Sequence, residues 1–187
     1  MKGRLAGVVA RSLRSIITVP SGAIYVPSGF KMLPCPKNDN PVWSYTDNLQ
    51  YCTALLVKPR DVTPESRYAF AHIEAIENKD DSGLCIELMI EELLRSNNAN
   101  LDDLMATLYS IYYSTELNPS LSSLANKTCE NKDFVERVFL DCGVTDISLV
   151  SGSSSTVKCN GLNITEVGSL SRAASYAVDK IAGKGRD

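Results

Sequence analysis

The sequence has a single histidine, His72, and its six cysteines include no Cys-x-x-Cys pair. Zinc sites usually use closely spaced cysteine and histidine ligands, so a site here would need cysteines from distant segments. The sequence also lacks any apolar run that approaches the roughly 20 residues of a membrane-spanning helix. We therefore expect no metal site and no transmembrane segment.

Acidic residues are absent from the first 38 positions, which carry six lysines and arginines. A basic start of this kind is typical of a targeting or secretion segment, and a solvated helix or arm is the alternative. Arg11 and Arg14 interrupt the apolar core that a secretory signal peptide would need. The formal net charge of −3 gives no reason to expect a nucleic-acid binder.

Disulfides are not expected, because nothing in the sequence signals export to an oxidising compartment. We expect most of the cysteines to be reduced thiols, with Cys85 and Cys142 buried on the inner faces of their helices. The remaining composition is that of a folded protein, with 44% hydrophobic and 22% charged residues. We predict a basic N-terminal segment over residues 1–30, as an arm or short strands, and a single α/β domain over residues 31–187.

Short apolar stretches predict strands in the first half of the chain. Residues 16–30 contain two β-prone stretches that each run into Val-Pro-Ser-Gly, so we expect short strands separated by turns. Residues 34–48 are rich in Pro, Asn and Asp and are predicted to form an irregular loop. Strands are expected over residues 53–57 and 68–76, joined by a polar linker.

The strand predicted over residues 68–76 has two different faces. With a period of two, one face carries the small side chains Ala69, Ala71, Ile73 and Ala75, and the other carries Tyr68, Phe70, His72 and Glu74. Small side chains suit the close packing of a covering helix or sheet. The pattern therefore places His72 on the face that holds the aromatic side chains.

The second half of the chain mixes helices and strands. Apolar residues at helical spacing predict helices over residues 84–95, 132–142 and 170–181. Between the first two helices we expect a helical turn at 101–104, a central strand over 105–115, for which a helix is the alternative, and a loop with a helical turn over 120–129. Strands are expected over 144–150, 156–159 and 162–167, the last two joined by an Asn160-Gly161 hairpin turn. These elements predict an α/β (α+β) fold, with a mixed, mostly antiparallel sheet and helices packed outside.

One group of residues in this pattern can carry covalent chemistry. A cysteine nucleophile needs a base, and His72 is the only side chain whose ordinary pKa suits that role near neutrality. Cys52 lies where a polar loop enters the strand before the histidine strand, so the two side chains are expected to lie side by side. Thr46, in the preceding loop, can hold the imidazole through its hydroxyl. The alternative is that Cys52 and His72 are ordinary packed residues.

The order Thr46, Cys52 and then Ala71-His72 in a strand of small residues resembles CheD, the chemoreceptor glutamine deamidase family. The resemblance covers residues 44–167 in outline and extends to the catalytic domain of cytotoxic necrotizing factor, which shares the fold. The family usually has Gly-Ser before its cysteine, where Gln50-Tyr51 stands here, and a glycine-rich segment where Ser114-Thr115-Glu116 stands. These departures favour a divergent, effector-type deamidase.

The resemblance implies a reaction and a partner. Cys52 would attack the carboxamide of a glutamine in a substrate protein, His72 would move the proton, and no metal or organic cofactor would be needed. The protein would act in the cytoplasm or after delivery into a host cell as an effector. Two other functions stay open: a non-enzymatic adaptor or secretion chaperone that docks through residues 170–181, and another Cys–His hydrolase such as a peptidase or thioesterase.

Overall fold

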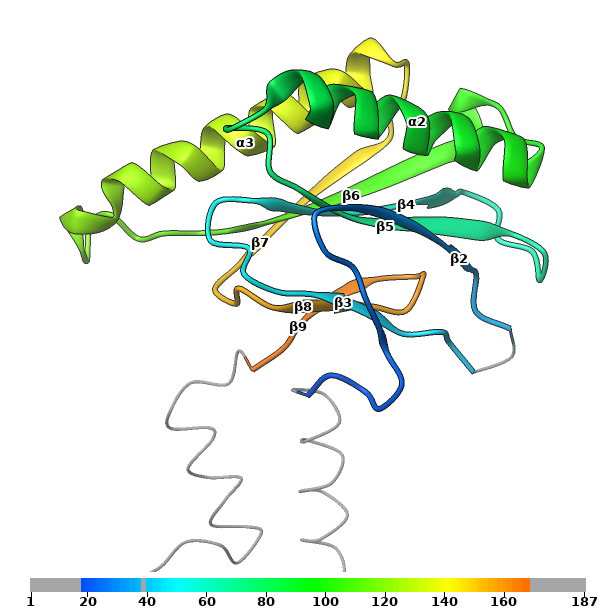
Figure 1. Cartoon of the computed structure of the whole chain (residues 1–187), viewed down its shortest axis with the longest axis horizontal. Coiled ribbons are helices and arrows are strands. Elements are labelled where there is room, and N and C mark those ends of the chain that lie inside the picture. The colour runs from blue at the N-terminus through cyan, green and yellow to red at the C-terminus, as the bar shows by residue number, and fades with distance from the viewer. Residues whose placement is uncertain (1–17, 38–39, 169–187) are drawn as a thin grey trace, which may run out of the picture.

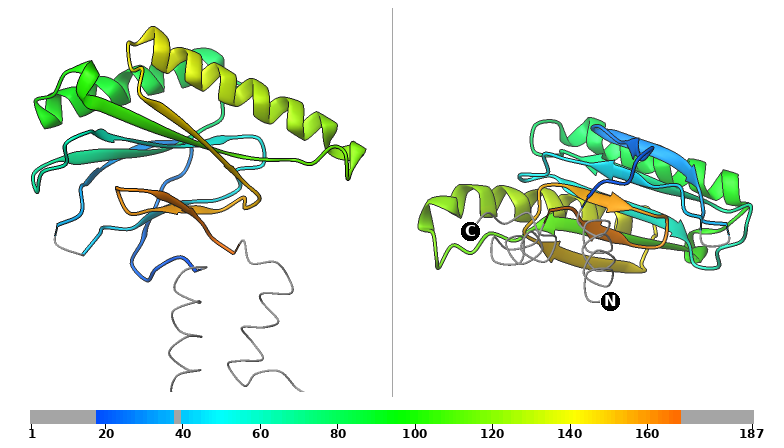
Figure 2. Two further views of the ribbon diagram at one scale, coloured as in Figure 1. Left: turned by 180° about the vertical axis from the view of Figure 1, so that it is seen from behind. Right: turned by 90° about the horizontal axis from the view of Figure 1, so that it is seen from below.

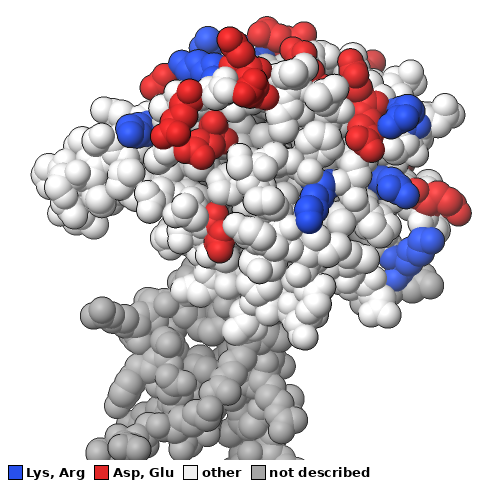
Figure 3. Space-filling view, viewed as in Figure 1, with Lys and Arg blue, Asp and Glu red and all other residues white. Residues whose placement is uncertain are grey.

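The computed structural model describes residues 18–37 and 40–168, which form three layers (Figures 1 and 2). Helices α2 (Lys79–Asn97) and α3 (Ser122–Asp141) cover one face of a five-stranded sheet, and a smaller four-stranded sheet lies against the other face. The charged side chains visible in Figure 3 gather mainly over the helix layer. The predicted helix over residues 170–181 and most of the basic N-terminal segment lie outside the described residues.

The five-stranded sheet has the order β2-β5-β4-β6-β7. Its strands pair antiparallel except for β6 and β7, which run parallel. In sheet order the strands are β2 (Gly29–Pro34), β5 (Arg67–Ile73), β4 (Thr53–Pro59), β6 (Leu104–Ile111) and β7 (Ile147–Gly152). A 3-10 turn, η1 (Leu101–Asp103), leads into β6, and a second, η2 (Pro119–Leu121), leads into α3.

The four-stranded sheet joins segments that are far apart in the sequence. Its order is β1 (Ile24–Tyr25), β3 (Ser44–Thr46), β8 (Val157–Cys159) and β9 (Ile164–Glu166). β1 and β3 pair parallel, whereas β8 pairs antiparallel with both of its neighbours.

The alternation of side chains along β4 and β5 produces two separate cores. The first lies under the helices and contains the small face predicted from the sequence, including Ala69, Ala71 and Ile73. The second lies between the two sheets and contains Tyr68 and Phe70. The α+β class is therefore confirmed, with the difference that the strands divide into two sheets. Among the residues that the structure describes, no helix is long and apolar enough to cross a membrane.

Three local predictions were wrong. The region predicted as a loop over residues 34–48 contains β3, whose three residues are held by pairing with β1 and β8 rather than by local propensity. The loop predicted over residues 120–129 is mostly helix, since α3 begins at Ser122 and extends the predicted helix by about ten residues. Helix α2 begins at Lys79 because the Asn78 side chain accepts a hydrogen bond from the Asp81 backbone N–H, which caps it earlier than expected.

Candidate functional site

The pairing of β4 with β5 brings Cys52 and His72 to one end of the sheet. Ala54 lies directly opposite His72 in the antiparallel register, and Cys52 lies two residues before Ala54. Both side chains line the same pocket, of about 260 Å³, between the two sheets and the loop before β4. They are largely buried, with 4% and 7% of their surfaces exposed.

Thr46 reaches the same histidine from the other sheet. Its side chain is fully buried on β3, and its Oγ1 lies 2.8 Å from His72 Nδ1. The contact between hydroxyl and imidazole that the sequence predicts is therefore present, although Thr46 comes from a strand and not from a loop. With Nδ1 occupied in this way, His72 makes no further side-chain hydrogen bond to a described residue, and its ring lines the pocket.

The turn before Cys52 is fixed by several hydrogen bonds. Asn48 adopts the left-handed conformation, with a φ of 56°, and the Cys52 backbone N–H donates to the Leu49 carbonyl at 3.0 Å. The Gln50 carbonyl accepts hydrogen bonds from the Tyr113 hydroxyl and, at 3.5 Å, from Thr128. The backbone before Cys52 is thus held by hydrogen bonds to Tyr113, which follows β6, and to Thr128 of α3.

Burial sets the resting charge of both groups. Loss of solvation raises the pKa of the Cys52 thiol to about 12, and the nearby carboxylates of Glu74 and Glu77 raise it further, whereas the Tyr51 backbone N–H opposes them. Burial also lowers the pKa of His72, against the smaller opposing effects of Glu74 and Asp47. At neutral pH the thiol and the imidazole that line this pocket are therefore both neutral, and no hydrogen bond joins them among the contacts of the described residues, so a base must take the thiol proton when the cysteine attacks.

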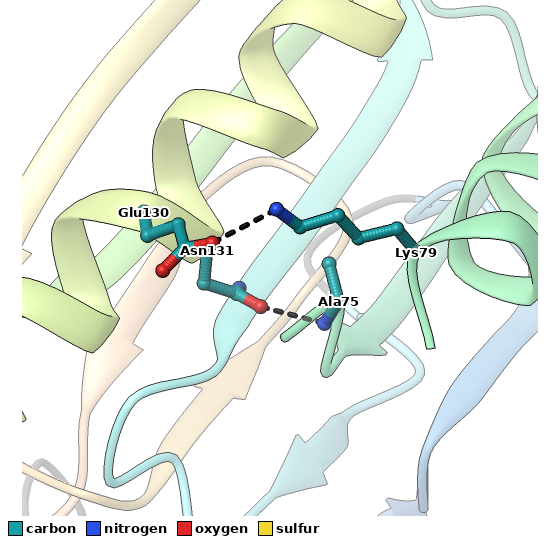
Figure 4. A network of polar contacts seen from close by, with 4 residues as sticks. All are labelled: Ala75, Lys79, Glu130 and Asn131. Carbon is teal, nitrogen blue, oxygen red and sulfur yellow. Dashed lines mark hydrogen bonds and ion pairs between the residues drawn. The ribbon is translucent and has the colours of Figure 1, made fainter. Parts of the chain in front are cut away.

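Asn131 is a residue that the sequence analysis missed. It is fully buried on α3, and its Nδ2 donates to Thr53 Oγ1 at 2.8 Å and to the Ile73 carbonyl at 3.1 Å. Its Oδ1 accepts from the Ala75 backbone N–H at 2.6 Å (Figure 4). One side chain thus ties together the residues that directly follow Cys52 and His72. Extending the inward stripe of Val135 and Phe139 back by four residues would have found it.

Among the remaining cysteines, Cys85 lines a neighbouring pocket that also contains His72. All six are free thiols within the described residues. The prediction that Cys85 and Cys142 are buried was wrong, since both are only partly buried at the edge of the core beneath the helices. Among residues 18–37 and 40–168, no group of three or more His, Cys, Asp or Glu side chains could hold a metal ion.

Comparison with known proteins gives no information on function, so the geometry of the Cys52–His72 pocket is the main guide. No protein-family model matches the chain, and no curated protein matches it either. The resemblance to CheD therefore stays a prediction, carried by Thr46, Cys52 and the Ala71-His72 pair.

Proposed function

We propose that this protein is a cysteine-dependent protein-glutamine deamidase. The observation that carries the proposal is the 2.8 Å contact between Thr46 Oγ1 and His72 Nδ1, in a pocket that Cys52 also lines. When Nδ1 carries the hydrogen and donates it to Thr46, the other ring nitrogen, Nε2, is an acceptor. Nε2 is then the atom that takes the thiol proton.

The reaction has two stages. As His72 takes the proton from Cys52, the sulfur attacks the side-chain carboxamide carbon of a substrate glutamine. The carbon–nitrogen bond then breaks, and ammonia leaves with the proton that His72 returns, which gives a thioester. In the second stage His72 removes a proton from water, and the hydroxide adds to the thioester carbon. The carbon–sulfur bond breaks and the sulfur takes the proton back from His72, which leaves glutamate and the free Cys52 thiol. Backbone N–H groups near Cys52 stabilise the oxyanion in both stages.

The substrate in this proposal is a folded protein rather than free glutamine. Remote contacts are needed to position a carboxamide for attack, and free glutamine lacks them. The enzyme works in the cytoplasm or after delivery into a host cell as an effector.

Mass spectrometry of a candidate partner protein tests the proposal. Deamidation replaces NH₂ by OH, so the partner gains about 1 Da and one negative charge at neutral pH. Cys52→Ser and His72→Ala should each abolish this change while the protein stays folded. Ammonia release without cleavage of the partner separates deamidation from a peptidase. If Cys52→Ser matched the wild type in every such assay, Cys52 would not be the nucleophile.

A non-enzymatic adaptor is the second candidate, and one observation favours it. Cys52 is 96% buried and its thiol has a pKa of about 12, as expected for a cysteine that only packs in the core. An adaptor would keep its cellular effect when Cys52 is replaced by serine, whereas the deamidase would lose it.

A further inference from the structure

Carboxylates surround the opening of the Cys52–His72 pocket. A second pocket, of about 360 Å³, shares Ser28, His72 and Glu74 with it and adds Glu77 and Asp81 to the lining. The two pockets thus form one groove, which we call the acidic groove, with His72 at its centre. Figure 3 shows acidic side chains along the helix layer, with basic side chains among them.

The negative charge of the acidic groove is not neutralised by the residues that the structure describes. The Tyr51 hydroxyl donates to Glu74 at 2.6 Å and also lies 3.5 Å from Glu77 Oε1, and neither carboxylate forms an ion pair with a described residue. Lys79 follows in sequence but pairs with Glu130 at 2.8 Å (Figure 4). The Nζ of Lys127 lies over the ring of Tyr51, 5.2 Å from its centroid.

These carboxylates oppose the chemistry proposed for Cys52. Two negative charges near the sulfur raise the pKa of the thiol and so disfavour its loss of a proton. A cation bound between the carboxylates would cancel that effect at the moment when the substrate arrives. His72, which is 93% buried and has no hydrogen-bond partner for Nε2 among the described residues, faces the same groove.

We propose that the acidic groove selects a basic segment of the substrate protein, with a lysine or arginine beside the target glutamine seated against the carboxylates of Glu74 and Glu77 that line it. The inference rests on the deamidase function proposed above and adds to it the charge of the substrate. Recognition and activation are then coupled, because the cation that docks the substrate also favours the thiolate of Cys52.

Three small thiol reagents of nearly equal size and different charge test this inference without any deamidation assay. They are 2-aminoethyl, ethyl and 2-sulfonatoethyl methanethiosulfonate, which carry charges of +1, 0 and −1. The Cys52 thiolate attacks the sulfur of each reagent, forms a mixed disulfide and releases methanesulfinate. The modification rate at Cys52 is followed by peptide mass mapping and divided by the rate with 2-mercaptoethanol.

At low salt we expect the cationic reagent to modify Cys52 about tenfold faster than the anionic one, and 1 M salt should remove most of the difference. Glu74→Gln combined with Glu77→Gln should bring the two rates together. Tyr51→Phe keeps both carboxylates and should retain the preference for the cationic reagent.

The matched control is Asp61→Asn combined with Glu65→Gln. These two exposed acids lie in the loop at the far end of β5, and their replacement should leave the preference unchanged.

Equal rates for the cationic and anionic reagents would overturn the proposal, as would a preference that survives the loss of Glu74 and Glu77. Failure of all three reagents to reach Cys52 would overturn it too, since no substrate could then enter the groove. Cys52-dependent deamidation of a glutamine in an acidic segment would refute the preference for a basic substrate segment but would support the deamidase function. A clear preference for the cationic reagent without deamidation of any partner would refute the deamidase function, and the acidic groove would then be a cation-binding groove only.

Discussion

Thr46 and His72 belong to different sheets, and the 2.8 Å contact between their side chains is a polar link across the core that separates those sheets. The histidine ring is therefore oriented by β3, while its backbone belongs to β5. A hydrogen bond at Nδ1 fixes both the tautomer and the direction in which Nε2 points.

Replacing Thr46 by valine tests this orientation. Valine keeps the shape but removes the hydroxyl, so we expect kcat for deamidation to fall by about tenfold to a hundredfold with little change in KM. Thr46→Ser should restore most of the rate. Thr165→Val, at an exposed position of the same small sheet, is the control and should have no effect. Equal rates for Thr46→Val and the wild type would show that the hydroxyl does not orient the base.

The single histidine makes its own titration easy to observe. Burial lowers the pKa of His72 below its ordinary value of 6.5, so the unfolded chain binds the proton more readily than the folded one. The free energy of unfolding should therefore fall as the pH drops from 6.5 to the pKa of the folded state, and His72→Gln should remove this part of the pH dependence. The imidazole Hε1 resonance, the only one in the chain, should titrate below pH 6.5 in a proton NMR experiment. A midpoint above 6.5 would contradict the prediction.

Asn131 should matter for stability as well as for the site. Asn131→Leu leaves the Ala75 N–H and the Thr53 hydroxyl buried without this partner, and each such group costs about 1–3 kcal/mol. We expect urea denaturation to show a loss of about 2–5 kcal/mol in the free energy of unfolding. Asn126→Leu, an exposed position on the same helix, is the matched control and should change stability by less than about 0.5 kcal/mol. Similar losses in both variants would assign the effect to the helix rather than to the buried amide.

Gly161, in the turn between β8 and β9, should tolerate no side chain. Its φ is +83°, and a Cβ atom there would lie 2.7 Å from the ring of Tyr68. Gly22 has a similar φ of +79° with nothing within 4 Å, so it separates backbone strain from steric overlap. We expect Gly22→Ala to cost about 1 kcal/mol and Gly161→Ala clearly more, as measured by thermal or urea unfolding. Equal costs would mean that Tyr68 moves aside freely.

The sequence predicts correctly those parts of the molecule whose structure is determined by neighbouring residues. The period of two along residues 68–73 places His72 on the correct face, and Asn160-Gly161 marks the turn that joins β8 to β9. Both signals arise from neighbouring residues, so the rest of the fold does not alter them.

The sequence analysis missed two parts of the site, one because it depends on distant partners and the other because the start of α3 was placed too late. β3 has only three residues, and its strand conformation comes from pairing with residues 24–25 and 157–159. Asn131 lies just before the helix predicted over residues 132–142, whereas α3 begins at Ser122 and buries Asn131 on its inward face. Its role then follows from the burial of an amide that must be satisfied.

The dependence of Thr46 on β8 also has a consequence for biosynthesis. Cys52 and His72 pair through β4 and β5 within the first 73 residues, whereas β3 needs β8, which is completed only at Cys159. A nascent chain can therefore form the strand pair that holds the thiol and the imidazole long before Thr46 is in place. The proposed base is oriented only after β8 has been synthesised, so a shorter nascent chain would hold Cys52 and His72 without the hydroxyl contact that orients the imidazole.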